Sequence, residues 1–96
     1  MYAAIRQTKL KPGTSEEVIQ RAREGALPLI SAVPGFKAYY MVLGDDDALT
    51  TVSIFEDKAA AETCNTKLLD WIKQNMGPYV AAPTQATAGR VAIHKA

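Results

Sequence analysis

The chain has 96 residues, of which 48% are hydrophobic, and its formal net charge is +1 at pH 7. A chain of this length is expected to form one domain over residues 1–96. Basic and acidic residues are interspersed without a Lys/Arg block, which argues against a nucleic-acid binder. No apolar run approaches the roughly 20 residues of a membrane span. Cys64 is the single cysteine, so an internal disulfide is excluded, and a lone thiol suits the reducing cytoplasm.

The first predicted element is a strand over residues 2–9. Its side chains alternate between two sets, one holding Ala3, Ile5 and Gln7 and the other holding Ala4, Arg6 and Thr8. Pro and Gly in Lys11–Gly13 then predict a loop.

A first helix is predicted to begin after Thr14. Thr14 and Glu17 match the T-x-x-E pattern of a capping box, and apolar residues recur at helical spacing as far as Ile30. Gly25 and Pro28 interrupt this pattern, because a proline ring clashes with the carbonyl four residues earlier in a straight helix. We therefore expect a kink, or a short second helical piece over about 26–32.

A strand over residues 36–43 organises the rest of the chain. The turn residues Pro34 and Gly35 precede it, and Gly44–Asp47 closes it. Strict alternation gives it two faces: Phe36, Ala38, Tyr40 and Val42 on one, and Lys37, Tyr39, Met41 and Leu43 on the other. Because both faces are mostly apolar, the strand is expected to need cover on both sides.

The remaining elements are a hairpin partner, a helix and a last strand. Residues 48–56 alternate as a strand, and the short connection predicts an antiparallel hairpin. Asp57 is expected to cap a second helix that ends at Gly77–Pro78. Its apolar face is predicted to comprise Ala60, Ala61, Cys64, Leu68, Trp71 and Ile72. Residues 84–95 are predicted to form the last strand.

The order β-α-β-β-α-β predicts a ferredoxin-like α+β fold, a four-stranded antiparallel sheet with both helices on one face. The other face then keeps an apolar set of side chains without cover. A bare patch of this kind usually marks an association surface. We therefore expect a homodimer in which two sheets pack face to face around a barrel-like core.

Four segments carry a resemblance that spans nearly the whole chain. They are Lys11–Gly13 after the first strand, Val33–Phe36 before the second, Ser53–Ala61 between the third strand and the second helix, and Gly89–Val91 in the last strand. With these segments the chain resembles the antibiotic biosynthesis monooxygenase (ABM) family of the dimeric α/β-barrel superfamily. The resemblance implies the dimeric barrel fold. The functions known in the family include cofactor-free oxidation of aromatic polyketides or quinols and haem degradation, and the family also includes small dimers without known activity.

The resemblance also implies site residues. Cofactor-free monooxygenases of the family use an Asn and a Trp on the second helix near a Tyr and an Arg, and this chain offers Asn65, Trp71, Tyr79 and Arg90. The family's Asn and Trp lie about one turn apart, whereas here they are six positions apart, about 240° around a helix. They therefore cannot face one pocket unless the helix is broken. The plainer interpretation makes Trp71 a core anchor and Asn65 a solvated residue.

Arg90 and the two adjacent tyrosines leave alternatives open. A buried Arg90 would need an acidic partner or an anionic ligand, and an inter-subunit salt bridge is the plainer interpretation. Tyr39 and Tyr40 point to opposite faces, so one should line the helix side or a cavity and the other the dimer face. Tyr40 and Tyr79 are the candidate substrate-binding residues, and simple packing is the alternative.

No cofactor is expected. Haem-degrading members of the family carry a ligating His after the second helix, but Met76–Pro83 contains none and His94 is the single histidine. Consecutive carboxylates in Asp45–Asp47 cannot easily converge on one ion, so a solvated turn is the expectation. Cys64 is expected to be a small buried hydrophobe rather than a nucleophile.

Two functional hypotheses follow. The first is a homodimeric, metal- and flavin-free monooxygenase whose aromatic or quinone-like substrate itself forms the carbanion that reacts with oxygen. It predicts a closed apolar cavity with room for a bicyclic ring, reached by at least two of Tyr40, Asn65, Trp71 and Arg90. The second is a non-catalytic dimer that binds a small ligand or serves in a stress response. An effector-binding module of a regulator is a weaker third, because no DNA-binding segment is attached.

Overall fold

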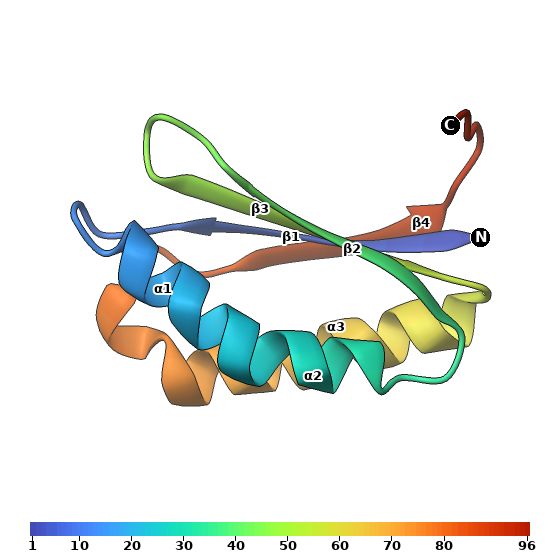
Figure 1. The fold of residues 1–96 in the computed structure, drawn as a ribbon, viewed down its shortest axis with the longest axis horizontal. Helices are drawn as coiled ribbons and strands as arrows, with labels where there is room; N and C mark the ends of the chain where they lie inside the picture. The colour runs from blue at the N-terminus through green and yellow to red at the C-terminus, as the bar shows by residue number, and fades with distance from the viewer.

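The computed structural model describes all of residues 1–96 and has a helical layer packed against one face of a sheet (Figure 1). The strands are β1 (Tyr2–Lys9), β2 (Phe36–Leu43), β3 (Ala48–Phe55) and β4 (Gln85–Arg90). The helices are α1 (Ser15–Arg21), the π-helix η1 (Ala22–Ala26), α2 (Leu27–Ser31), α3 (Lys58–Asn75) and the 3₁₀-helix η2 (Gly77–Tyr79). The sheet is antiparallel in the order β2-β3-β1-β4, which confirms the predicted ferredoxin-like arrangement. No helix has the length and hydropathy needed to cross a membrane.

The first helical segment, formed by α1, η1 and α2 in succession, changes its winding at the place where the sequence predicts a kink. The N–H of Leu27 bonds to the carbonyl of Ala22, five residues back, so η1 is a turn of π-helix. The widened turn lets the helix resume as α2 with Pro28 in its first turn, where no backbone donor is required. The predicted interruption is therefore confirmed, and it takes the form of a π-turn without a break in the helix.

The two predicted N-caps have different outcomes. The Asp57 carboxylate accepts a hydrogen bond from the N–H of Ala60 at 2.8 Å, which confirms the cap of α3. Thr14 makes no side-chain cap bond, and its hydroxyl instead donates to the carbonyl of Lys11 at 2.7 Å. The capping box is therefore wrong, because Thr14 serves the preceding turn and Glu17 accepts a hydrogen bond from Arg21 at 2.9 Å.

Strict alternation along β2 is wrong at its first residues. The pairing with β3 shifts register between Phe36 and Ala38, so a bulge reverses the parity. Phe36 packs edge-on against Phe55, which is fully buried, with ring centroids 5.9 Å apart. Beyond the bulge Tyr40 is 59% exposed, so it does not share a face with Phe36.

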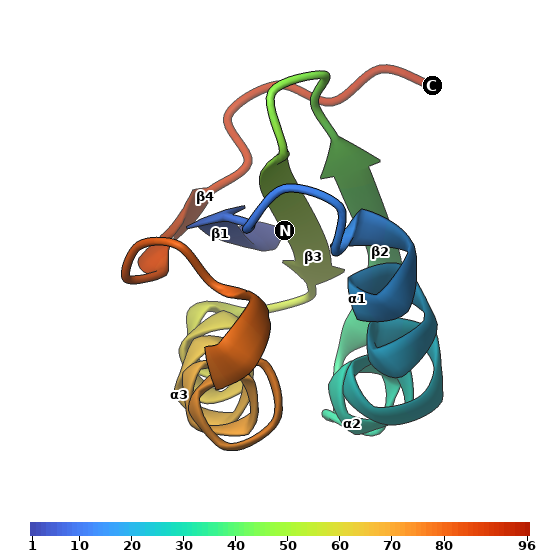
Figure 2. The same ribbon diagram turned by 90° about the vertical axis from the view of Figure 1, so that its left-hand side faces the viewer.

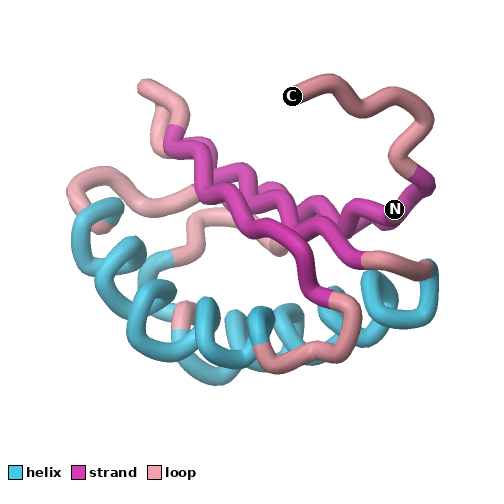
Figure 3. The backbone as a smooth tube through the Cα atoms, turned by 45° about the vertical axis from the view of Figure 1, so that its right-hand side comes forward, coloured by secondary structure: helices cyan, strands magenta, loops and turns pink.

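The face of the sheet away from the helices is open, as the sequence predicts (Figure 2). The register places small, apolar and a few polar side chains on it: Ala3, Ile5 and Gln7 from β1, Thr50, Val52 and Ile54 from β3, and Ala38, Tyr40 and Val42 from β2. The two helical segments lie together on the opposite side (Figure 3).

The last strand is shorter than predicted. β4 ends at Arg90, whereas a strand over 84–95 was expected. The N–H of Val91 still bonds to the carbonyl of Met1 at 2.9 Å, but no later residue pairs with β1, because β1 begins at Tyr2. The tail then leaves the sheet on the side away from the helices (Figure 1), and Ile93 is 90% exposed.

Candidate functional site

The polar centre of the helix–sheet interface is Arg6, which is 2% exposed. It lies in the middle of β1 and points toward the helical layer. Its Nε donates to Thr51 Oγ1 at 2.9 Å, and its Nη2 donates to Ser53 Oγ at 2.8 Å, both on the neighbouring strand β3. Its Nη1 donates to Asn65 Oδ1 at 3.0 Å and contacts Cys64 Sγ at 3.6 Å, both on α3. Two strands and one helix therefore hold the guanidinium in a fixed position.

No carboxylate pairs with this buried charge. The ion pairs of the structure join Lys9 to Asp46, Arg21 to Glu17, Lys37 to Glu56, and Lys58 to Glu62. Arg6 has only neutral oxygen and sulfur partners. Burial lowers the pKa of its guanidinium from the ordinary value, an effect that Cys64 and Tyr39 oppose. Arginine nevertheless stays protonated at neutral pH, so the site keeps a positive charge without a counter-ion.

A small, mostly apolar cavity lies beside the guanidinium between the sheet and the helices. It encloses about 40 Å³, and most of its wall is aliphatic, including Val18, Leu49, Leu68 and Ile72. Arg6 is the single charged group in this wall. A space of this size holds a few water molecules at most, because one water needs roughly 10–15 Å³ by this measure. The prediction of a ready-made cavity for a bicyclic ring is therefore wrong.

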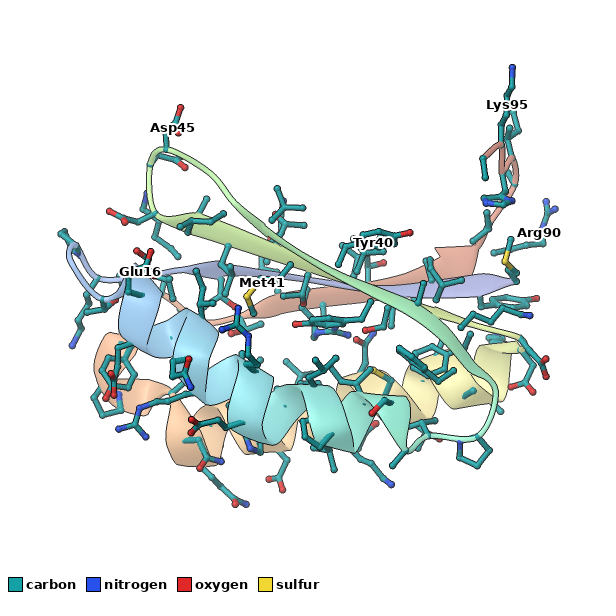
Figure 4. All side chains as sticks on the ribbon, in the orientation of Figure 1. Glu16, Tyr40, Met41, Asp45, Arg90 and Lys95 are labelled. Carbon is teal, nitrogen blue, oxygen red and sulfur yellow. The ribbon has the colours of Figure 1, made fainter.

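Tyr39 brings a phenol to the same cavity. Met41, two residues further along β2, lies beside it on the helix side of the sheet, whereas the neighbouring Tyr40 points away (Figure 4). Burial raises the pKa of the Tyr39 phenol, although nearby Arg6 opposes the shift. The phenol is therefore neutral at physiological pH and keeps its proton as a hydrogen-bond donor.

Trp71 lines the cavity from α3, and residues of the first helical segment line it as well. A Cβ atom placed on Gly25 would lie 2.7 Å from Cζ2 and 3.0 Å from Nε1 of this indole. Only glycine permits this approach, because real Cβ contacts are essentially never that short. Gly25 therefore lets the first helical segment approach α3 closely at Trp71, whose side chain lines the cavity.

Asn65 lies outside the cavity and contacts it through Arg6. Its side chain does not line the cavity, but its Oδ1 accepts from Arg6 while its Nδ2 donates to the carbonyl of Thr87 on β4 at 3.0 Å. The helix α3 is continuous, so Asn65 and Trp71 do not face one pocket, as the spacing predicts. Asn65 instead links the guanidinium to the edge strand of the sheet.

The other candidate residues lie outside the cavity. Tyr40 is on the open face, because β2 places Tyr39 on the helix side. Arg90 is exposed at the end of β4 and points away from the cavity (Figure 4), since β4 carries it to the outer end of the sheet. Tyr79 does not line the cavity, and its ring packs under the guanidinium of Arg21 at 5.3 Å. Of the four residues expected to reach the cavity, only Trp71 lines it.

Sequence reasoning missed Arg6 as the arginine of the site and left open which tyrosine faces a cavity. A signal for Arg6 was present, because Arg6 alternates with Ala4 and Thr8 on one side of its strand, and all three are buried. A charged residue among small inward-facing neighbours indicates a buried charge with a specific environment.

Comparison with known proteins decides the family. The family model described as antibiotic biosynthesis monooxygenase matches residues 1–65, which include Arg6, Tyr39 and Asn65. The chain belongs to the ABM family. No curated protein sequence matches this ABM chain.

Solved structures share the fold of this ABM protein at low sequence identity. A protein of unknown function from Nitrosomonas europaea is 19% identical with a TM-score of 0.80, covering 99% of this chain and 92% of that one. A monooxygenase from Streptomyces coelicolor, from the gene ActVA-Orf6 and in complex with nanaomycin D, is 21% identical with a TM-score of 0.70 and the same coverage. A mutant of MhuD with two manganese protoporphyrin IX molecules per active site is 12% identical with a TM-score of 0.77, covering 100% and 99%. At these identities the likeness shows the fold alone.

Metal-ligating side chains do not gather anywhere in the structure. No three His, Cys, Asp or Glu residues lie close enough together to hold an ion. His94 is exposed on the tail beyond β4, and Asp45 and Asp46 are exposed in the β2–β3 turn. Cys64 is fully buried, as expected for a small hydrophobe, but it also contacts the Arg6 guanidinium.

Proposed function

We propose that this ABM protein is a cofactor-independent monooxygenase of small phenols or quinols. The observation that carries the proposal is the buried, uncompensated charge of Arg6 in the wall of an apolar cavity. A fixed positive charge in a site that excludes water stabilises an anion far more than the same charge does in solution. A phenolate or quinol anion bound there would gain this stabilisation.

The proposed chemistry begins with loss of a proton from the bound quinol. Its oxygen lies toward Arg6, and the neutral phenol of Tyr39 is available as a second donor. The quinol anion carries negative charge onto a ring carbon, and this carbon forms a bond to dioxygen. The O–O bond then breaks: one oxygen atom stays on the ring as a hydroxyl group, while the other takes up the proton first lost from the quinol and the proton of the attacked ring carbon and leaves as water, so that quinol plus O₂ gives hydroxyquinone plus H₂O. The quinol supplies all four electrons, and no outside reductant is needed.

The size of the cavity limits the substrate. Because it encloses about 40 Å³, a ring can enter only when side chains of the wall move outward. Met41 lies in this wall, and methionine has three rotatable bonds that let it repack around a ligand. A single aromatic ring fits this picture better than the fused rings expected from the sequence.

Oxygen uptake with hydroquinone as the probe tests the proposal. The wild type should consume oxygen faster than buffer alone without releasing hydrogen peroxide, so added catalase should return no oxygen. Arg6→Met should lower the rate at least about 100-fold, as expected for loss of a preorganised charge in a dry site. Arg90→Gln is the matched control, because Arg90 is exposed and outside the cavity, and it should keep the wild-type rate.

A non-catalytic ligand-binding protein is the second candidate. The small cavity favours it, and so does the complete hydrogen bonding of the buried polar side chains, which leaves none without a partner. Under this view Arg6 is a structural residue. Hydroquinone binding without oxygen uptake would establish the second candidate over the first. Uptake unchanged in a folded Arg6→Met variant would contradict the role of Arg6 in the first.

We also propose that the protein works as a homodimer built on the open face of the sheet. Support comes from the apolar side chains that the register gathers there, among which Tyr40 is 59% and Val42 is 56% exposed. A patch of this kind on a chain of this size is typical of an association surface.

A further inference from the structure

A groove lies outside the cavity, between the first helical segment and the edge strand β2. It encloses about 250 Å³, and all but one of its lining side chains are hydrophobic. Ile19, Arg23 and Leu27 line it from the helical side, and Leu43 lines it from the strand. The groove has the length of two helical turns, since Ile19, Arg23 and Leu27 are successive positions four residues apart.

The groove and the cavity share one wall. Ala22, Tyr39 and Met41 line both spaces, so only these side chains separate them. Figure 4 shows Met41 in the layer between β2 and the first helical segment. Ala22 is small, Met41 is flexible, and Ala22 begins the π-turn η1, a kind of turn found frequently at functional sites. This wall can therefore open by movement of side chains.

A second groove, on the other side of the cavity, is a poorer route. It encloses about 460 Å³ and shares Ile72 and Val80 with the cavity. The backbone on each side of Val80 is fixed: Lys11 N–H donates to the Tyr79 carbonyl at 2.8 Å, and Ala81 N–H donates to the Lys9 carbonyl at 2.7 Å. No backbone hydrogen bond joins α1 or η1 to β2. The wall between the cavity and the groove at β2 is therefore more easily displaced than the wall at Val80.

Arg23 is the single charged side chain of the groove at β2. It takes part in no ion pair and no hydrogen bond. Its helical neighbours four residues away, Ile19 and Leu27, are apolar, and the adjacent Glu24 accepts a hydrogen bond from Gln20 at 2.5 Å. A free guanidinium at the mouth of an apolar groove suits a carboxylate, which it can bind through two parallel hydrogen bonds.

We propose that this groove is the entrance to the cavity and a second subsite of the ligand. An apolar arm that ends in a carboxylate lies along Ile19 and Leu27 and binds Arg23, while the aromatic ring passes Met41 into the cavity. The substrate class is therefore an aromatic acid, a phenol or quinol that carries a short carboxylate arm. This inference rests on the proposed function only in taking the cavity as the place where the ring binds.

Binding of two matched probes tests the inference. The probes are 3-(2,5-dihydroxyphenyl)propanoic acid and its uncharged amide, and the signal is quenching of the single tryptophan, Trp71, in the cavity wall. The wild type should bind the acid about tenfold more tightly than the amide, as expected for a charge-assisted contact. Arg23→Gln should remove this preference and leave amide affinity unchanged, while Arg23→Lys should keep part of it.

Arg21→Gln is the control for loss of an exposed arginine from the same helix, because Arg21 is paired with Glu17 and lies outside the groove. It should keep the full preference for the acid. The inference is overturned if Arg23→Gln still prefers the acid, if Arg21→Gln loses the preference equally, or if the wild type binds both probes alike or neither at millimolar concentration.

The route is tested by association rates measured in stopped flow. Leu27→Phe narrows the groove at β2, and Ala81→Phe narrows the second groove. Only Leu27→Phe should slow association of the acid, and slowing by Ala81→Phe alone would overturn the route. Oxygen uptake from hydroquinone, which has no arm, is independent of Arg23. If the wild type shows no oxygen uptake from hydroquinone but still prefers the acid probe, the proposed function is overturned and the subsite is retained.

Discussion

At the scale of single residues, Arg6 is the feature that distinguishes this interior from an ordinary packed core. A buried charge normally has a charged partner, because desolvation of an unpaired ion costs several kcal/mol even after relaxation, on the order of the whole stability of a small domain. Here Thr51, Ser53 and Asn65 supply neutral acceptors instead. The charge is held in place without being neutralised, which is the arrangement that an anionic ligand would exploit.

Tyr39 gives a prediction about pH at the same scale. Burial raises the pKa of its phenol above the ordinary 10.0, so above pH 10 the unfolded chain loses this proton before the folded protein does. The folded state then binds more protons than the unfolded state, and the free energy of unfolding falls as pH rises through this window. Tyr39→Phe should flatten the decline in urea unfolding curves between about pH 9.5 and 11.

Tyr40→Phe is the control for this pH dependence, because Tyr40 is the neighbouring tyrosine on the open face and 59% exposed. It should leave the decline of stability unchanged. An equal flattening in both variants would show that the effect belongs to tyrosines in general and would contradict the buried environment of Tyr39.

At the scale of elements, the first helical segment and α3 meet where Gly25 contacts the Trp71 indole. Gly25→Ala should destabilise the protein by about 1–3 kcal/mol, because the added methyl group overlaps the ring. In a Trp71→Phe background the overlap is relieved, and the same change should stabilise by up to about 1 kcal/mol through helix propensity. Thermal unfolding of the four proteins in this cycle measures the change of sign.

Gly77→Ala serves as the comparison for this cycle, since nothing lies within 4 Å of a Cβ atom placed there. Its effect should stay within about 0.5 kcal/mol in both backgrounds. If Gly25→Ala were as harmless as Gly77→Ala, the close packing of the two helices at this point would be contradicted.

Several features governed by local stereochemistry were predictable from the sequence, although the capping box at Thr14 was wrong, and the detailed pairing of the strands was not predictable. The interruption before Pro28 follows from a clash within one helical turn, and Asp57 caps α3 with its own carboxylate. The bulge between Phe36 and Ala38 depends on how β2 pairs with β3, so alternation alone could not predict it. The alternation of Arg6 with Ala4 and Thr8 was a signal that the sequence carried, but its contact with Asn65, 59 positions away in sequence, follows only from the fold.

At the scale of the whole molecule, the sheet has one covered and one open face (Figure 2). Val52 lies at the centre of the open face, paired with Ile5 on one side and Tyr40 on the other. Val52→Glu should weaken the proposed dimer at least about tenfold, since it places a charge in an apolar interface. Sedimentation velocity at micromolar concentration should show a wild-type dimer and a dissociating variant.

Thr66→Glu is the surface control for the dimer, because Thr66 is exposed on α3 and away from the sheet. This variant should sediment as the wild type does. A wild-type protein that remains a monomer at micromolar concentration would contradict assembly through the open face.

The central claim is that the cavity stabilises an anionic oxygen through Arg6. The most direct measurement is the pKa of 4-nitrophenol bound to the protein, followed through the visible absorption of its phenolate. An apolar cavity alone would raise this pKa, whereas a cavity with an uncompensated guanidinium should lower it by about one unit or more. Wild-type protein is predicted to lower it and folded Arg6→Met to raise it. A raised pKa in the wild type, equal shifts in both proteins, or no binding would contradict the claim.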